Sequence, residues 1–137
     1  MSRSGYTDDL NDWSLIMWRG AVASAIRGGR GQQFLAEMLK ALDALPEPKL
    51  VANALEESGQ VCAMGAVGKS RGINMSVIDA EDRETVAATF GIAGALAAEI
   101  AFQNDEGSWR ESPEQRFARM QAWVQRKITA PLPEPPK

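Results

Sequence analysis

Gly59-Gln60-Val61-Cys62-Ala63-Met64-Gly65-Ala66-Val67-Gly68-Lys69-Ser70-Arg71-Gly72 is the stretch around which the rest of the chain must fold. It holds the only cysteine and the densest run of small residues. We expect a short helix over residues 63–71, although glycine is a poor helix former. Gly65 and Gly68 suit a helix only where a neighbouring backbone approaches very closely, so the pattern predicts a central position for this helix.

The end of the stretch also matches a loose phosphate-loop pattern, with alanine in place of the first glycine. In such loops backbone N–H groups surround the phosphates and a lysine neutralises them. The motif needs a preceding parallel-sheet strand and a long helix that starts at Lys69-Ser70, but Gly72 follows too soon. Close helix packing is therefore the favoured interpretation. Cys62, flanked by Val61 and Ala63, is favoured as a buried small residue rather than a nucleophile.

Two amphipathic helices are predicted before this stretch. The first covers about Asp9–Arg27, where acidic residues precede an apolar stripe of helical spacing. Gly28-Gly29-Arg30-Gly31 is expected to end it through a positive φ. The second covers about Gly31–Leu45 and stops at Pro46. The short glycine connection predicts an antiparallel helical hairpin.

The segment from Lys49 to Gln60 leaves two alternatives open. A short β-hairpin would pair Leu50–Leu55 with Gln60–Cys62 around a Ser58-Gly59 turn. A helix through residues 53–57 is the rival interpretation. We favour the hairpin.

Helical signals return after Gly72. An acidic start at residues 79–82 precedes an apolar stretch that Gly91 interrupts, and an alanine-rich, buried helix is expected over Ile92–Asn104. The last helix begins with Ser112 as N-cap, Pro113 as first residue and Gln115 at the capping-box position.

These patterns together predict a mainly α protein, a compact bundle of about five to six helices with at most one short β-hairpin at about residues 50–62. The expected organisation is a flexible N-terminus over 1–8, a single helical domain over 9–128 and a proline-rich disordered tail over 129–137.

Composition narrows the function classes. The 137 residues carry a formal net charge of −3 and no histidine. The charge argues against a dedicated nucleic-acid binder. The missing histidine removes Ser-His and Cys-His nucleophilic pairs and the usual base near neutral pH, so we expect no enzyme and no cofactor. No apolar run approaches 18 residues and no signal peptide is evident, which predicts a cytoplasmic protein without a membrane span.

The polar cluster after the alanine-rich helix is the main candidate site. Asn104 and Asp105 could form a pocket wall, which Trp109, Glu111 and Arg116 are near enough in sequence to join. The favoured interpretation is structural, because Asn and Asp at a helix end bond nearby backbone groups. EF-hand spacing is absent, so no metal is expected.

Further candidate residues point to a protein or phosphate partner. Trp18 and Trp109 lie off the predicted core stripes and could anchor a partner. Arg27 and Arg30, together with Arg19, could form a local basic patch for an acidic partner or a phosphate.

Three signals taken together carry a family resemblance. They are Trp18-Arg19-Gly20-Ala21, Gly59 to Ala66, and Phe102-Gln103-Asn104-Asp105-Glu106-Gly107 followed by Ser112-Pro113-Glu114-Gln115-Arg116. The chain resembles a group of short uncharacterised proteins of bacteriophage, prophage and bacterial genomes. It is more distantly similar to a domain of unknown function with a C-x-x-G-A-L … N-D pattern. The resemblance implies a phage or mobile-element origin, and no catalytic residues can be carried over from it.

Two functional hypotheses follow. The first is a phage-type, non-enzymatic binding protein that modulates a host protein, including a host-defence component, in the cytoplasm of the bacterial cell. The alternative is a small-ligand or nucleotide-binding protein with a pocket near Asn104-Asp105 and Cys62–Ser70. A homodimer is compatible with both, since the short apolar hairpins could leave a face uncovered.

Overall fold

The computed structural model describes residues 3–4, 12–107 and 110–129. Its elements, in chain order, are α1 (Asp12–Arg27), α2 (Gly29–Asp43), β1 (Glu56–Glu57), β2 (Gln60–Val61), α3 (Ala63–Ser70), the 3-10 helix η1 (Met75–Val77), α4 (Arg83–Phe90), α5 (Gly94–Asp105) and α6 (Pro113–Lys127). Helices dominate this part of the chain, and its strands form a single two-stranded hairpin. The predicted mainly α bundle is confirmed.

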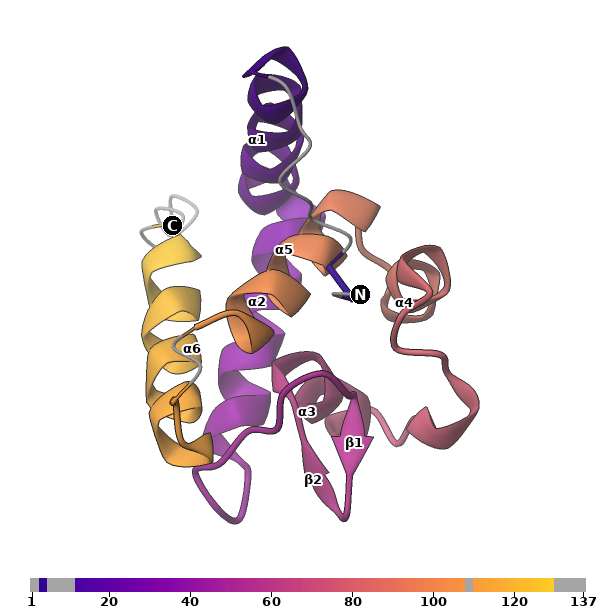
Figure 1. The fold of residues 1–137 in the computed structure, drawn as a ribbon, viewed down its shortest axis with the longest axis vertical. Helices are drawn as coiled ribbons and strands as arrows, with labels where there is room; N and C mark the ends of the chain where they lie inside the picture. Colours follow the sequence, from indigo (N-terminus) through magenta and orange to yellow (C-terminus); the bar gives the residue numbers. More distant parts are fainter. Residues whose placement is uncertain (1–2, 5–11, 108–109, 130–137) are drawn as a thin grey trace, which may run out of the picture.

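Helix α2 is the central element of the molecule. Helix α6 lies alongside it, and α3 packs against its C-terminal half (Figure 1). The predicted apolar side of α2 is buried, at Phe34, Leu35, Met38, Ala41 and Leu42. On the facing helix α6, Met120, Trp123 and Val124 are buried. These interlocking apolar faces form the main core.

The predicted antiparallel hairpin of α1 and α2 is wrong. Only Gly28 separates the two helices, and α1 and α2 follow each other end to end with a bend (Figure 1). The φ of Gly28 is −64°, and its N–H still bonds the carbonyl of Ser24 while its carbonyl accepts from Gln32. A reversal of direction needs a loop of about 2–5 residues, which a single shared residue cannot supply.

The predicted β-hairpin exists, but its first strand lies later in the chain than Leu50–Leu55. Glu56 pairs with Val61 and Glu57 with Gln60 in antiparallel register. Ser58 and Gly59 have φ values of 52° and 81°, as a tight two-residue hairpin turn requires. The rival helix over residues 53–57 is therefore excluded.

Helix α3 has the predicted central position. Residues 63–68 are all buried. A Cβ added at Gly65 would lie 2.0 Å from the carbonyl oxygen of Leu55, so only glycine allows the backbone of the hairpin to approach this closely. At the chain start, Arg3 and Ser4 are buried. The proline-rich tail beyond Thr129 lies outside the described residues.

Candidate functional site

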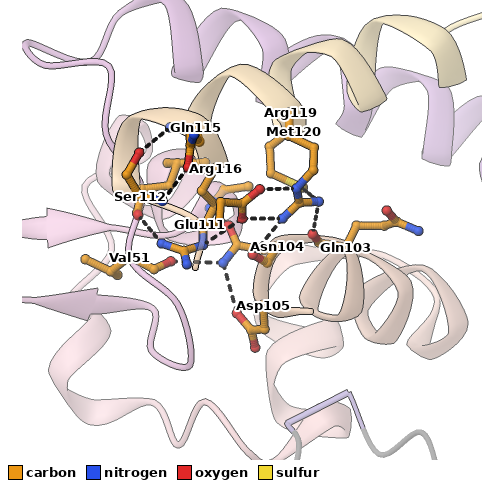
Figure 2. Close-up of polar contacts among 12 residues, drawn as sticks. Val51, Gln103, Asn104, Asp105, Glu111, Ser112, Gln115, Arg116, Arg119 and Met120 are labelled. Carbon is orange, nitrogen blue, oxygen red and sulfur yellow. Dashed lines mark hydrogen bonds and ion pairs between the residues drawn. The ribbon is translucent and has the colours of Figure 1, made fainter. Parts of the chain in front are cut away.

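Asn104 is the centre of a buried polar cluster at the end of α5. Its side chain is fully buried. Its Oδ1 accepts the N–H of Ala63 at 3.0 Å, and its Nδ2 donates to the carbonyl of Val51 and to Asp105 Oδ1, both at 2.9 Å (Figure 2). One amide thereby joins α5, the first turn of α3 and the segment before the hairpin. Bonds to nearby backbone groups were expected from the sequence, whereas these backbone partners lie 41 and 53 residues away.

Asp105 binds the side chain of Arg3. Arg3 Nε and Nη2 donate to its two carboxylate oxygens at 2.5 and 2.8 Å, and the N–H of Asn53 donates to Oδ1 at 3.0 Å. The Arg3 and Asp105 side chains are only 4% and 3% exposed. This is a bidentate, charge-assisted pair in a dry environment.

Cys62 lies beside the same guanidinium. Arg3 Nη1 donates to its sulfur at 3.6 Å, and the N–H of Gly65 donates to it at 3.3 Å. The thiol is therefore the N-cap acceptor of α3. Cys62 is fully buried, which agrees with the interpretation favoured from sequence.

A second set of charges ties α6 to α5. Arg119 donates to the carbonyls of Gln103 and Asn104, the latter at 3.2 Å, and so satisfies the open C-terminal end of α5. Its Nε and Nη2 also donate to Glu111, which pairs with Arg116 Nε at 3.5 Å as well. These contacts are drawn in Figure 2. They brace the turn between the two helices.

Arg116 reaches back to the segment before the hairpin. Its Nη1 donates to the carbonyl of Leu50 at 2.9 Å. The N–H of Leu50 donates to the carbonyl of Pro113 at 3.1 Å. The first turn of α6 is therefore bonded to this segment in both directions.

The electrostatics of the two carboxylates follow from these contacts. Burial pushes the pKa of Asp105 upward, but the bonds and charge of Arg3 outweigh it and hold the pKa below the ordinary carboxyl value. Hydrogen bonds from Arg119 lower the pKa of Glu111 against a smaller opposing effect of burial. Both groups stay ionised at neutral pH, so neither is suited to act as a general acid there.

Four of the described candidate residues lie in or beside this cluster. Cys62 and Asp105 both bond Arg3, Asn104 bonds the first residue of α3, and Arg116 bonds Leu50, the neighbour of Val51. The remaining described candidates, Trp18, Arg27 and Arg30, lie on α1 and the start of α2. Trp109 lies outside the described residues.

Sequence reasoning missed Arg3 and Arg119, whereas Glu111 was named beside Arg116. The spacing of Arg116 and Arg119 by three residues, on one face of a strongly signalled helix, could have indicated a paired basic contact. Nothing in the sequence around Arg3 indicates that it is buried.

The space around these residues limits what can bind. Beside Arg3 lies a cavity of about 10 Å³, roughly the volume of one water. A surface hollow of about 80 Å³ lies between Lys49, Lys69 and the hairpin. Small-molecule sites usually measure about 300–1,000 Å³, so neither space holds a nucleotide. Lys69 and Ser70 end α3 rather than start a helix, which is the opposite of a phosphate loop.

Among the described residues no group of His, Cys, Asp and Glu is arranged to hold a metal ion. In the same ranges no single helix is long and apolar enough to cross a membrane, and only α4 and α5, bent by 106°, reach the required length together.

Comparison with known proteins found no matching family model, curated protein or solved structure. The resemblance to small phage proteins therefore stays a prediction.

Proposed function

We propose that this chain is a non-enzymatic protein-binding module that docks through the outer face of α1. The observation that carries the proposal is the exposure of Ile16 and Met17, at 61% and 59%, side by side on one helix. Single exposed apolar residues are common, but adjacent large ones on one face mark an interaction surface. A helix that is apolar on both its inner and outer sides normally has neighbours on both.

The outer face of α1 has a shape suited to close contact. Ile16, Met17, Gly20, Ala21 and Ser24 are exposed on one side of the helix. A Cβ added at Gly20 would meet nothing within 4 Å. Ile16 and Met17 supply apolar contact area at one end of this face, and the small residues at the other end let a partner backbone approach closely. Helix α1 also extends away from the rest of the molecule (Figure 1).

Charge indicates the chemistry of the partner. Arg19 and Arg27 on α1 and Arg30 on α2 are exposed. We therefore infer a partner protein with an apolar groove bordered by carboxylates, which would take α1 as a helix in a groove. The resemblance to phage proteins supports a host protein as the partner, including components of host defence, in the bacterial cytoplasm.

A capture experiment with matched variants tests this. The wild-type chain is used as bait in host lysate beside Met17→Glu and Val77→Glu. Val77 is 78% exposed and lies in η1, away from α1, so it is the control for an apolar-to-acidic change. We expect a protein that binds the wild type and Val77→Glu and is lost with Met17→Glu. Equal capture by all three would refute the assigned surface.

A further inference from the structure

Arg3 and Ser4 lie in the protein as a bound peptide would. Besides the Arg3 bonds to Asp105 and Cys62, the Ser4 hydroxyl donates to Glu106 Oε2 at 3.3 Å. The Ser4 carbonyl accepts from Arg83 Nη1 at 3.2 Å. These partners lie on α4 and α5 or cap α3 and α5, and each bond joins residues at least 59 positions apart in the sequence. The protein therefore binds both the side chain of Arg3 and the main chain of Ser4.

The receiving side is organised independently of Arg3. The Asp105 carboxylate is oriented by the N–H of Asn53 and by Asn104 Nδ2. The small cavity beside Arg3 is lined by Arg83 and by apolar side chains of the hairpin segment and of α3, α4 and α5: Leu55, Met64, Val86, Ala97 and Ala101. The planar donor fork of Arg3 therefore meets two fixed carboxylate oxygens beside a largely apolar space.

We infer that Asp105, with Cys62, forms a recognition site for an arginine side chain, and that Arg3 is its occupant within the chain. The site accepts the arginine of another peptide when Arg3 is displaced. An empty site would leave Asp105 buried without a cation, which is strongly unfavourable. An ammonium group supplies the charge but not the fork, so the site distinguishes arginine from lysine. This inference does not depend on the outer face of α1.

The test removes the Arg3 side chain and supplies an arginine in a separate peptide. The full-length Arg3→Ala variant is melted with and without millimolar acetyl-Ser-Arg-Ser-Gly-amide, which repeats the local sequence. Acetyl-Ser-Lys-Ser-Gly-amide is the matched control peptide. We expect the arginine peptide to raise the melting temperature by about 4 °C, from a dissociation constant of about 1 mM and a ligand at about ten times that value. The lysine peptide should leave the melting temperature unchanged.

The wild type should not respond at the same concentration, because its tethered Arg3 competes at a high effective concentration. Cys62 gives a second readout, since it is the only thiol in the chain and Arg3 lies against it. Modification of Cys62 by a small thiol reagent should be at least tenfold faster in Arg3→Ala, and the arginine peptide should restore protection. Adding Asp105→Asn to Arg3→Ala should abolish both responses.

Equal effects of the two peptides, or no effect of either, would overturn the inference. If Arg3→Ala does not fold alone, refolding by the arginine peptide supports it. If the peptide fails to refold that variant, the same melting experiment is done with Arg3→Lys, which keeps a buried positive charge opposite Asp105. The absence of any peptide-dependent melting shift in Arg3→Lys then overturns the inference. Sedimentation of the wild type tests one source of the arginine, because a dimer that is lost in Arg3→Ala identifies a second copy of the chain.

Discussion

Replacing Asn104 by leucine tests whether the polar cluster holds the fold together. Leucine has a similar size, so the change removes hydrogen bonds without opening a large cavity. It leaves the N–H of Ala63 and the carbonyl of Val51 buried without their side-chain partner. Each such group costs about 1–3 kcal/mol, and the added apolar surface offsets part of this. We expect a net loss of about 3 kcal/mol in the free energy of unfolding.

Urea denaturation followed by tryptophan fluorescence measures this loss. With a slope of about 2 kcal/mol per molar urea, the midpoint should fall by about 1.5 M. Gln103→Leu is the matched control, because Gln103 is the preceding residue and its side-chain amide donates to Glu99 on the same helix. That variant should stay within about 0.5 kcal/mol of the wild type. If Asn104→Leu lowered the free energy of unfolding as little as Gln103→Leu, the hydrogen bonds of Asn104 would not stabilise the fold as proposed.

Three further perturbations follow from the same contacts. Gly65→Ala should destabilise the protein by more than about 2 kcal/mol in urea titrations, because the added Cβ would collide with the carbonyl of Leu55. Gly20 lies in a helix with open space beside it, so Gly20→Ala should stabilise the protein by up to about 1 kcal/mol in the same titrations. The pKa of Asp105 is lowered in the folded state, so its stabilisation is fully present above about pH 4 and is lost as the pH falls through the folded-state value. The stability difference between wild type and Asp105→Asn should therefore narrow from about pH 7 to about pH 3, and a constant difference would contradict the assigned ion pair. Ser112→Ala removes the side-chain half of the capping box and should cost about 1 kcal/mol, measured as a lower thermal midpoint.

Local signals made much of the fold predictable. The capping box at Ser112 and the apolar stripe of α2 are encoded within a few residues, and both elements occur as expected. Gly65 also indicated its own environment, since a glycine inside a helix implies a close neighbour. The geometry between α1 and α2 was not predictable in this way. The glycine run suggested a loop, but the second and third glycines are helical in α2.

The candidate site was predictable only in part, because its contacts join distant segments. Asn104 and Asp105 stood out as polar residues after an apolar helix. Their partners Val51 and Arg3 lie 53 and 102 residues away, respectively, and no local pattern identifies them. The first strand was misplaced for a related reason. The sequence Leu50-Val51-Ala52 resembles the start of a strand, but residues 52–55 form bends and Asn53 has a φ of 64°. The polar groups of residues 50–55 bond α5, α6 and the N-terminus of α3 in addition to β2.

The central claim is that the outer face of α1 is the binding surface. The most direct measurement is the dissociation constant of the captured partner for wild type, Met17→Glu and Val77→Glu. A central interface residue contributes about 2 kcal/mol or more, so Met17→Glu should weaken binding about 30-fold while Val77→Glu leaves it unchanged. Equal dissociation constants for the wild type and Met17→Glu would contradict the claim.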